Sequence, residues 1–102
     1  MIIHQREISY SANYSEFFEA LLKVKAHLRK KYPEISVELM YNLAGPRGRA
    51  TIQTRYASLA DYEQIDAELD NDEEYSKLLE SIISATGELP VDQFYRIIKS
   101  PY

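Results

Sequence analysis

Hydrophobic and polar residues alternate along residues 35–43, the clearest pattern in the chain. The apolar side consists of Ile35, Val37, Leu39, Tyr41 and Leu43. A period of two over this length predicts a β-strand with one buried face. A second alternating run covers residues 50–57, and Gly45 and Gly48 lie in the turn between the runs, at 44–49. Together the two runs predict a β-hairpin.

The register of this hairpin follows if the turn leaves Leu43 opposite Ala50. Glu38 then faces Arg55 on the polar side, while the apolar residues of both strands share the other side. A register with one apolar face and a matched charge pair is internally consistent. We therefore predict that Glu38 and Arg55 are cross-strand partners.

Two more segments have β character, at the two ends of the chain. Residues 2–10 are rich in Ile and alternate roughly, and residues 91–99 are again β-type before Pro101. The first segment has no cleanly apolar face. The pattern predicts two strands and leaves open which side of each is buried.

Apolar residues recur every three or four positions after the first strand, which predicts a long amphipathic helix. Its stripe consists of Tyr14, Phe17, Leu21, Val24, Leu28 and Tyr32. Asn13 and Glu16 resemble a capping box at its start, and Pro33 ends it. His27 lies on the opposite face among lysines, so we expect it to be solvated.

Two shorter helices are predicted in the second half of the chain. Ser58 and Asp61 form a cap signal for the first, which ends where residues 70–72 interrupt the pattern. The second covers about 72–86 and ends at Gly87, the residue type expected just after a helix. Four tyrosines on inner stripes are expected to pack between sheet and helices: Tyr41, Tyr56, Tyr62 and Tyr75.

The predicted order is β-α-β-β-α-α-β, with the two closing helices acting as one crossover. This order is typical of the split β-α-β, or ferredoxin-like, α+β fold, in which a four-stranded antiparallel sheet carries helices on one face. The other face would hold semi-polar residues such as Ser36, Met40 and Gln53. Because symmetric dimers are the commonest assemblies, we expect two copies to pair these faces around a mixed lumen.

Composition limits the possible classes of function. The chain has 102 residues, a formal net charge of −4 and no cysteine, which excludes disulfides, thiolate metal sites and cysteine nucleophiles. Its length favours one domain over 1–102, and the lack of a long apolar run or signal-peptide pattern favours a cytoplasmic protein. Nine aromatic residues are Tyr, three are Phe and none is Trp; tyrosine suits half-wet cavities and interfaces.

Three segments carry a further pattern. Arg55-Tyr-Ala-Ser-Leu-Ala-Asp-Tyr-Glu runs from a strand into a helix, Leu69-Asp-Asn-Asp-Glu-Glu-Tyr opens the last helix, and the first helix contains Phe17-Phe-Glu-Ala-Leu-Leu. Together these segments resemble the dimeric α+β barrel superfamily, especially its NIPSNAP-like branch. The resemblance implies a homodimer with face-to-face sheets, as in antibiotic-biosynthesis-type monooxygenases and muconolactone-isomerase-like enzymes. Haem-degrading members use an Asn, Trp and His set, and because this chain has no Trp that activity is not expected.

Six side chains are candidates for contact with a ligand: His4, Arg6, Tyr10, Glu38, Arg55 and Tyr95. His4, with Arg6 on the same face, could move a proton or bind a carboxylate or enolate; the alternative is an edge or interface histidine without chemistry. Glu38 and Arg55 could polarise a ligand in a dimer cavity, or could simply stabilise the hairpin as an ion pair. Tyr10 and Tyr95 are the tyrosines for which a cavity role stays open.

Several kinds of site are disfavoured. Eight acidic residues between Asp61 and Glu74 lack the spacing of an EF-hand loop, so we interpret them as a solvated helix face and predict no metal site. The third strand lacks the signature of an RNA-recognition domain and the net charge is negative, so no nucleic-acid partner is expected. No nucleotide-binding fingerprint is present, and we predict no cofactor.

We therefore expect a homodimeric α+β barrel that binds a small organic molecule in its lumen. Two alternatives stay open: a cofactor-free monooxygenase or isomerase, and a structural dimerisation module. For an enzyme, His4, Arg6 and Arg55 are expected to converge on one cavity. The residues alone do not decide whether a reaction is catalysed.

Overall fold

The computed structural model describes residues 1–10, 14–45, 48–86 and 88–101. Within them lie the strands β1 (Ile2–Ser9), β2 (Ser36–Tyr41), β3 (Arg49–Tyr56) and β4 (Val91–Arg96), and the helices α1 (Tyr14–Lys31), α2 (Leu59–Asp70) and α3 (Glu73–Thr86). The predicted order of elements is confirmed. The expected cap at Asn13 and helix end at Gly87 lie outside the described residues. None of the helices, over the described part of the chain, has the length and apolar character needed to cross a membrane.

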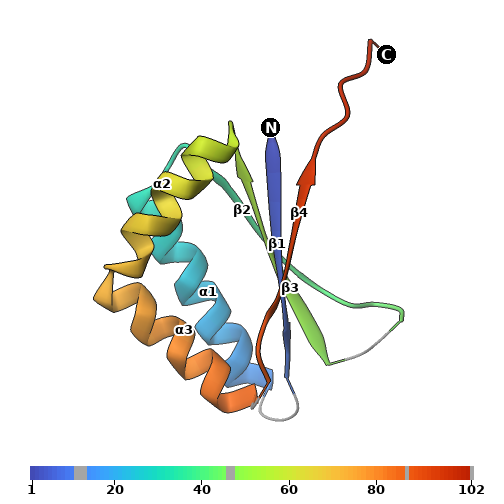
Figure 1. Cartoon of the computed structure of the whole chain (residues 1–102). Coiled ribbons are helices and arrows are strands. Elements are labelled where there is room, and N and C mark those ends of the chain that lie inside the picture. Colours follow the sequence, from blue (N-terminus) through green and yellow to red (C-terminus); the bar gives the residue numbers. More distant parts are fainter. Residues whose placement is uncertain (11–13, 46–47, 87, 102) are drawn as a thin grey trace.

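The strands form one antiparallel sheet in the order β2-β3-β1-β4, and the helices cover one face of it (Figure 1). This is the predicted ferredoxin-like α+β fold. An apolar core fills the space between the two layers. Its most deeply buried side chains are Ile8, Leu21, Val24 and Ile82.

The register of the hairpin differs from the predicted one by two residues. Tyr41 pairs with Ala50, and Glu38 pairs with Gln53 rather than with Arg55. The predicted pairing of Glu38 with Arg55 is therefore wrong. A shift of two residues leaves each side chain on its predicted face, which is why the helix-facing side of each strand was still predicted correctly.

Gly48 fixes the start of β3 against the end of β1. Gly48 has a φ of +74°, and its carbonyl accepts a hydrogen bond from the Tyr10 backbone N–H at 2.7 Å. A Cβ at this position would lie 2.8 Å from the Tyr10 carbonyl oxygen, so the close approach requires glycine. This contact aligns Arg49 with the end of β1, and β3 begins there.

The structure also decides which faces of the outer segments are buried. Ile2, His4 and Ile8 of β1 are buried beneath the helices, so the odd residues of β1 lie on the open face of the sheet. The last strand is shorter than predicted and ends at Arg96. Beyond it, the Ile97 backbone N–H still donates to the Met1 carbonyl at 3.3 Å.

Tyr41 does not pack as predicted. Its side chain is 61% exposed and lies 6.1 Å from the Phe18 ring, centroid to centroid. Tyr41 is the last residue of β2, which is an edge strand of the sheet. The alternation of the sequence places its side chain on the helix-facing side but does not show that the helices cover this corner poorly. Tyr56 is buried, and Tyr62 and Tyr75 are half-buried and pack against the core, as predicted.

Asp72 joins α1 to the start of α3. Its carboxylate accepts hydrogen bonds from His27 Nε2 at 2.6 Å, from Lys31 Nζ at 2.9 Å and from the Tyr75 backbone N–H at 3.1 Å. His27 also lies 3.4 Å from the carboxylate of Glu74, between Nδ1 and Oε2. The prediction that His27 is solvated was therefore wrong, because the packing of α3 on α1 places an acidic helix start beside it.

Candidate functional site

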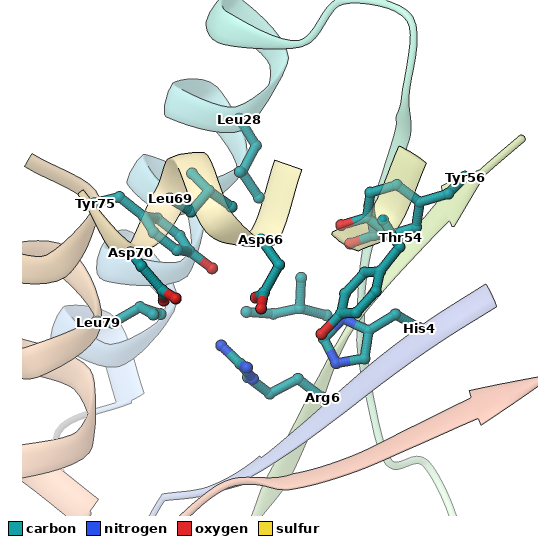
Figure 2. Close-up of a pocket in the computed structure, with 12 residues that line it drawn as sticks. His4, Arg6, Leu28, Thr54, Tyr56, Asp66, Leu69, Asp70, Tyr75 and Leu79 are labelled. Atoms are coloured by element: carbon teal, nitrogen blue, oxygen red, sulfur yellow. The ribbon is translucent and has the colours of Figure 1, made fainter. Parts of the chain in front are cut away.

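A pocket of about 170 Å³ lies between the sheet and the helices α2 and α3 (Figure 2). Its apolar lining consists of Leu28, Ile52, Leu69 and Leu79. Polar side chains from β1 and α2 reach the same space, among them those of His4, Arg6 and Asp66. A cavity of about 150 Å³ holds one benzene molecule, so the pocket has the size of a single-ring compound.

The pocket forms because the helix-facing side of β1 is polar in its middle. Ile2 and Ile8 are buried near the ends of the strand, but His4 and Arg6 occupy the two helix-facing positions between them. Thr54, which pairs with His4 across the sheet, is buried too. Polar groups at this depth need hydrogen-bond partners, so α2 and α3 cannot close on them as on an apolar core.

Asp92 holds His4 and Arg6 in place. Its Oδ1 accepts from Arg6 Nε at 2.8 Å and contacts His4 Nε2 at 3.0 Å, while its Oδ2 accepts from Arg6 Nη2 at 3.3 Å. Burial alone would raise the pKa of Asp92, but the bonds from Arg6 and His4 lower that pKa overall. Because an ionised carboxylate only accepts, His4 donates through Nε2 and keeps a lone pair on Nδ1.

The protonation states of the other polar groups follow from burial. Burial lowers the pKa of His4 below its ordinary 6.5, against the opposing effect of the bond to Asp92, so the imidazole is neutral at pH 7. Burial also raises the pKa of Tyr56 to about 12 and raises those of Tyr62 and Tyr75 above their ordinary value. The three phenols therefore stay protonated and can act as hydrogen-bond donors.

An aromatic wall links the pocket to β4, because His4 and Tyr62 of the lining both contact Phe94. Phe94 stacks on His4 with ring centroids 4.6 Å apart, and Tyr62 meets the Phe94 ring edge to face at 4.9 Å. Tyr62 also contacts the Tyr56 ring at 5.3 Å. Phe94 is 48% exposed, so this aromatic wall borders solvent.

The structure brings together two of the six predicted site residues. His4 and Arg6 line one pocket and share one carboxylate. Glu38, Arg55 and Tyr95 lie on the opposite face of the sheet, as the strand pairing shows. The expected convergence of Arg55 with His4 and Arg6 therefore does not occur.

Tyr10 lies away from this pocket. Its ring stacks on Phe17 at 4.7 Å and contacts Tyr14 and Phe18 at 5.1 and 5.4 Å. These rings form an aromatic cluster where α1 begins. Tyr10 is thus placed among packed side chains, a role the sequence had left open.

Sequence reasoning missed Asp92, Asp66 and the aromatic wall. Asp92 is revealed only by the register of β4, which places it directly opposite Arg6. Asp66 was interpreted as part of a solvated acidic face. The one available signal was its spacing of four residues from Tyr62, which puts both on the same side of α2.

Comparison with known proteins shows the fold. No protein-family model and no curated protein matches the chain in sequence. An uncharacterized NIPSNAP domain protein from Burkholderia xenovorans has a TM-score of 0.78 at 12% identity, covering 100% of this chain and 97% of its own. A NIPSNAP family protein from Agrobacterium tumefaciens has a TM-score of 0.77 at 13% identity, with 99% of this chain and 87% of that protein covered. A candidate antibiotic biosynthesis monooxygenase from Caulobacter crescentus has a TM-score of 0.75 at 14% identity, with 96% of this chain and 91% of that protein covered. The chain therefore has the ferredoxin-like α+β fold of NIPSNAP-domain and antibiotic-biosynthesis-monooxygenase-like structures, the resemblance that its sequence indicated.

Proposed function

We propose that the pocket beneath α2 and α3 binds a small organic molecule of about one ring. The observation that carries the proposal is the combination of an apolar lining with polar groups that are already held in place. Asp92 fixes His4 and Arg6 before a ligand arrives, which reduces the entropy lost on binding. This location differs from the dimer lumen expected from sequence, because His4 and Arg6 face the helices.

A second candidate function, proton transfer on the bound molecule, is favoured by the bond between His4 and Asp92. A neutral imidazole whose Nε2–H is held by a carboxylate can accept a proton at Nδ1. An isomerisation would take a proton from carbon to Nδ1 and return it to another atom of the same molecule, with no oxidant required. This candidate corresponds to the isomerase alternative considered above.

Benzyl alcohol is expected to bind the chain with a Kd of about 1 mM or tighter, which is about −4 kcal/mol, and to perturb amide resonances of β1 and α2. Leu79→Trp fills the pocket and is expected to weaken binding at least tenfold, measured by NMR titration. The matched control is Leu78→Trp, because Leu78 is also half-buried on α3 but lines a separate groove between α1 and α3.

Equal weakening by both tryptophan variants, with both still folded by circular dichroism, would contradict the assigned location. Failure of benzyl alcohol and of similar ring compounds to bind the wild type would leave the structural dimerisation module as the better reading. Deuterium exchange into a bound carbon acid in D₂O, lost in His4→Ala, is the result expected for the proton-transfer candidate.

We also propose that two copies associate through the open face of the sheet. This face carries partly apolar side chains such as Met40, Val91 and Tyr95, of which Met40 is 41% and Val91 55% exposed. Light scattering is expected to give twice the mass of the 11.9 kDa chain. Met40→Lys together with Tyr95→Lys is expected to shift the mass to that of one chain, and a wild type already at that mass would refute the proposal.

A further inference from the structure

We infer that the molecule bound in this pocket carries an organic ammonium group, which the Asp66 carboxylate receives. The inference rests on the binding function proposed above and specifies the chemical class of the ligand. It depends on three features of the pocket: its charge balance, the position of Asp66 and the aromatic rings around it.

The charges around the pocket have a negative excess. Arg6 is the one guanidinium in the lining, and Asp66 and Asp70 are its carboxylates. Asp92 already neutralises Arg6 through two contacts with its guanidinium. With His4 neutral, two negative charges remain without a compensating cation in the lining, so an anionic ligand would meet repulsion and a cationic one attraction.

Asp66 is the carboxylate placed to receive the cation. Figure 2 shows it pointing from α2 into the middle of the pocket, toward His4 and Arg6. It is half-buried, and no hydrogen bond or ion pair to another described residue holds it. Its charge also acts on His4, Tyr56, Tyr62 and Tyr75, which places it within electrostatic reach of all four.

Aromatic faces beside a carboxylate are suited to an organic cation. The Tyr62 ring lies one turn before Asp66 on α2 and packs between Tyr56 and Phe94. A cation over the face of such a ring is attracted by its quadrupole, and the attraction increases when water is excluded. The carboxylate would bind the N–H groups of an ammonium, and the apolar lining would contact the ring that carries it.

The test compares three probes of nearly equal size, namely benzylamine, benzyl alcohol and benzoate, by NMR titration at pH 7. We expect benzylammonium to bind about tenfold or more tightly than benzyl alcohol, and benzoate to bind most weakly. Asp66→Asn preserves shape and removes the charge, so it is expected to bring the two affinities within about threefold while benzyl alcohol binds as before. Asp61→Asn on the exposed first turn of α2 is the matched control and is expected to keep the wild-type preference.

Two results would overturn the inference alone: benzoate binding more tightly than benzylammonium, or a preference for benzylammonium that survives Asp66→Asn. Both leave the proposed binding function standing, because a ligand still binds in the pocket. If none of the three probes binds, the proposed binding function itself fails and the inference fails with it.

Discussion

Replacing Asp72 with alanine is expected to lower the free energy of unfolding by about 2–3 kcal/mol. The change removes the acceptor for the Tyr75 backbone N–H at the start of α3 and the carboxylate that His27 and Lys31 share. For a chain of this size the loss corresponds to a fall in Tm of roughly 10–20 °C. Urea denaturation at pH 7, with thermal melts alongside, measures both values.

Two matched variants separate the causes. Asp72→Asn keeps a side-chain oxygen that can cap α3 but loses the charge. Its free energy of unfolding is therefore expected to lie between those of the wild type and the alanine variant. Asp61→Ala removes an exposed carboxylate from the first turn of α2, where Ser58 provides the cap, and is expected to cost less than about 0.5 kcal/mol. Equal losses in Asp72→Ala and Asp61→Ala would contradict the assigned role.

The same carboxylate predicts how stability depends on pH. Hydrogen bonds from His27, from the Tyr75 N–H and from Lys31 hold the pKa of Asp72 well below its ordinary 3.8. Because the folded-state pKa lies below the unfolded one, the stabilisation is fully present above about pH 4 and is lost as the pH falls toward the folded-state pKa. The stability difference between wild type and Asp72→Asn is therefore expected to shrink on acidification below about pH 4.

Leu21→Ala is expected to lower the free energy of unfolding by about 3 kcal/mol, which is the second large effect. Leu21 is 2% exposed on the face of α1 that packs into the core, so truncation removes buried apolar area and leaves a cavity. The measurement is again urea denaturation, at low protein concentration so that self-association does not contribute.

The adjacent residue is its control. Leu22 has the same side chain and lies in the same helix, but it is 60% exposed. Leu22→Ala is expected to change stability by less than about 0.5 kcal/mol. A loss for Leu22→Ala comparable to that for Leu21→Ala would mean that α1 packs on a different face.

The repeat of apolar positions was sufficient to predict the elements and their layers. The stripe from Phe17 to Leu28 correctly identified the buried face of α1, and the alternation from Val37 to Leu39 correctly identified the helix-facing side of β2. The cap at Ser58 was also correct, since its hydroxyl accepts the Asp61 N–H. These features depend on residues near each other in the chain, and a local pattern contains that information.

The candidate site was only partly predictable, because a local pattern contains no information on contacts between residues that are distant in the chain. His4 and Arg6 could be singled out because they share one face of the first strand. Asp92 is separated from them by more than eighty positions, and its contact exists only because β4 pairs with β1 in one particular register. The Glu38–Arg55 pairing failed because alternation cannot distinguish the observed register from one shifted by two residues.

The sequence by itself thus determined the fold class, the buried stripes and the lack of cysteine chemistry, all of which follow from periodicity and composition. The tertiary structure decided which side of β1 faces the helices, and with it whether His4 and Arg6 meet a dimer lumen or an internal pocket. It also placed Asp66, an expected surface residue, in the lining of the pocket, and made His27, expected to be solvated, a partner of Asp72. The physical reason is that burial and charge environment are set by elements distant in the chain, and no local pattern records which elements those are.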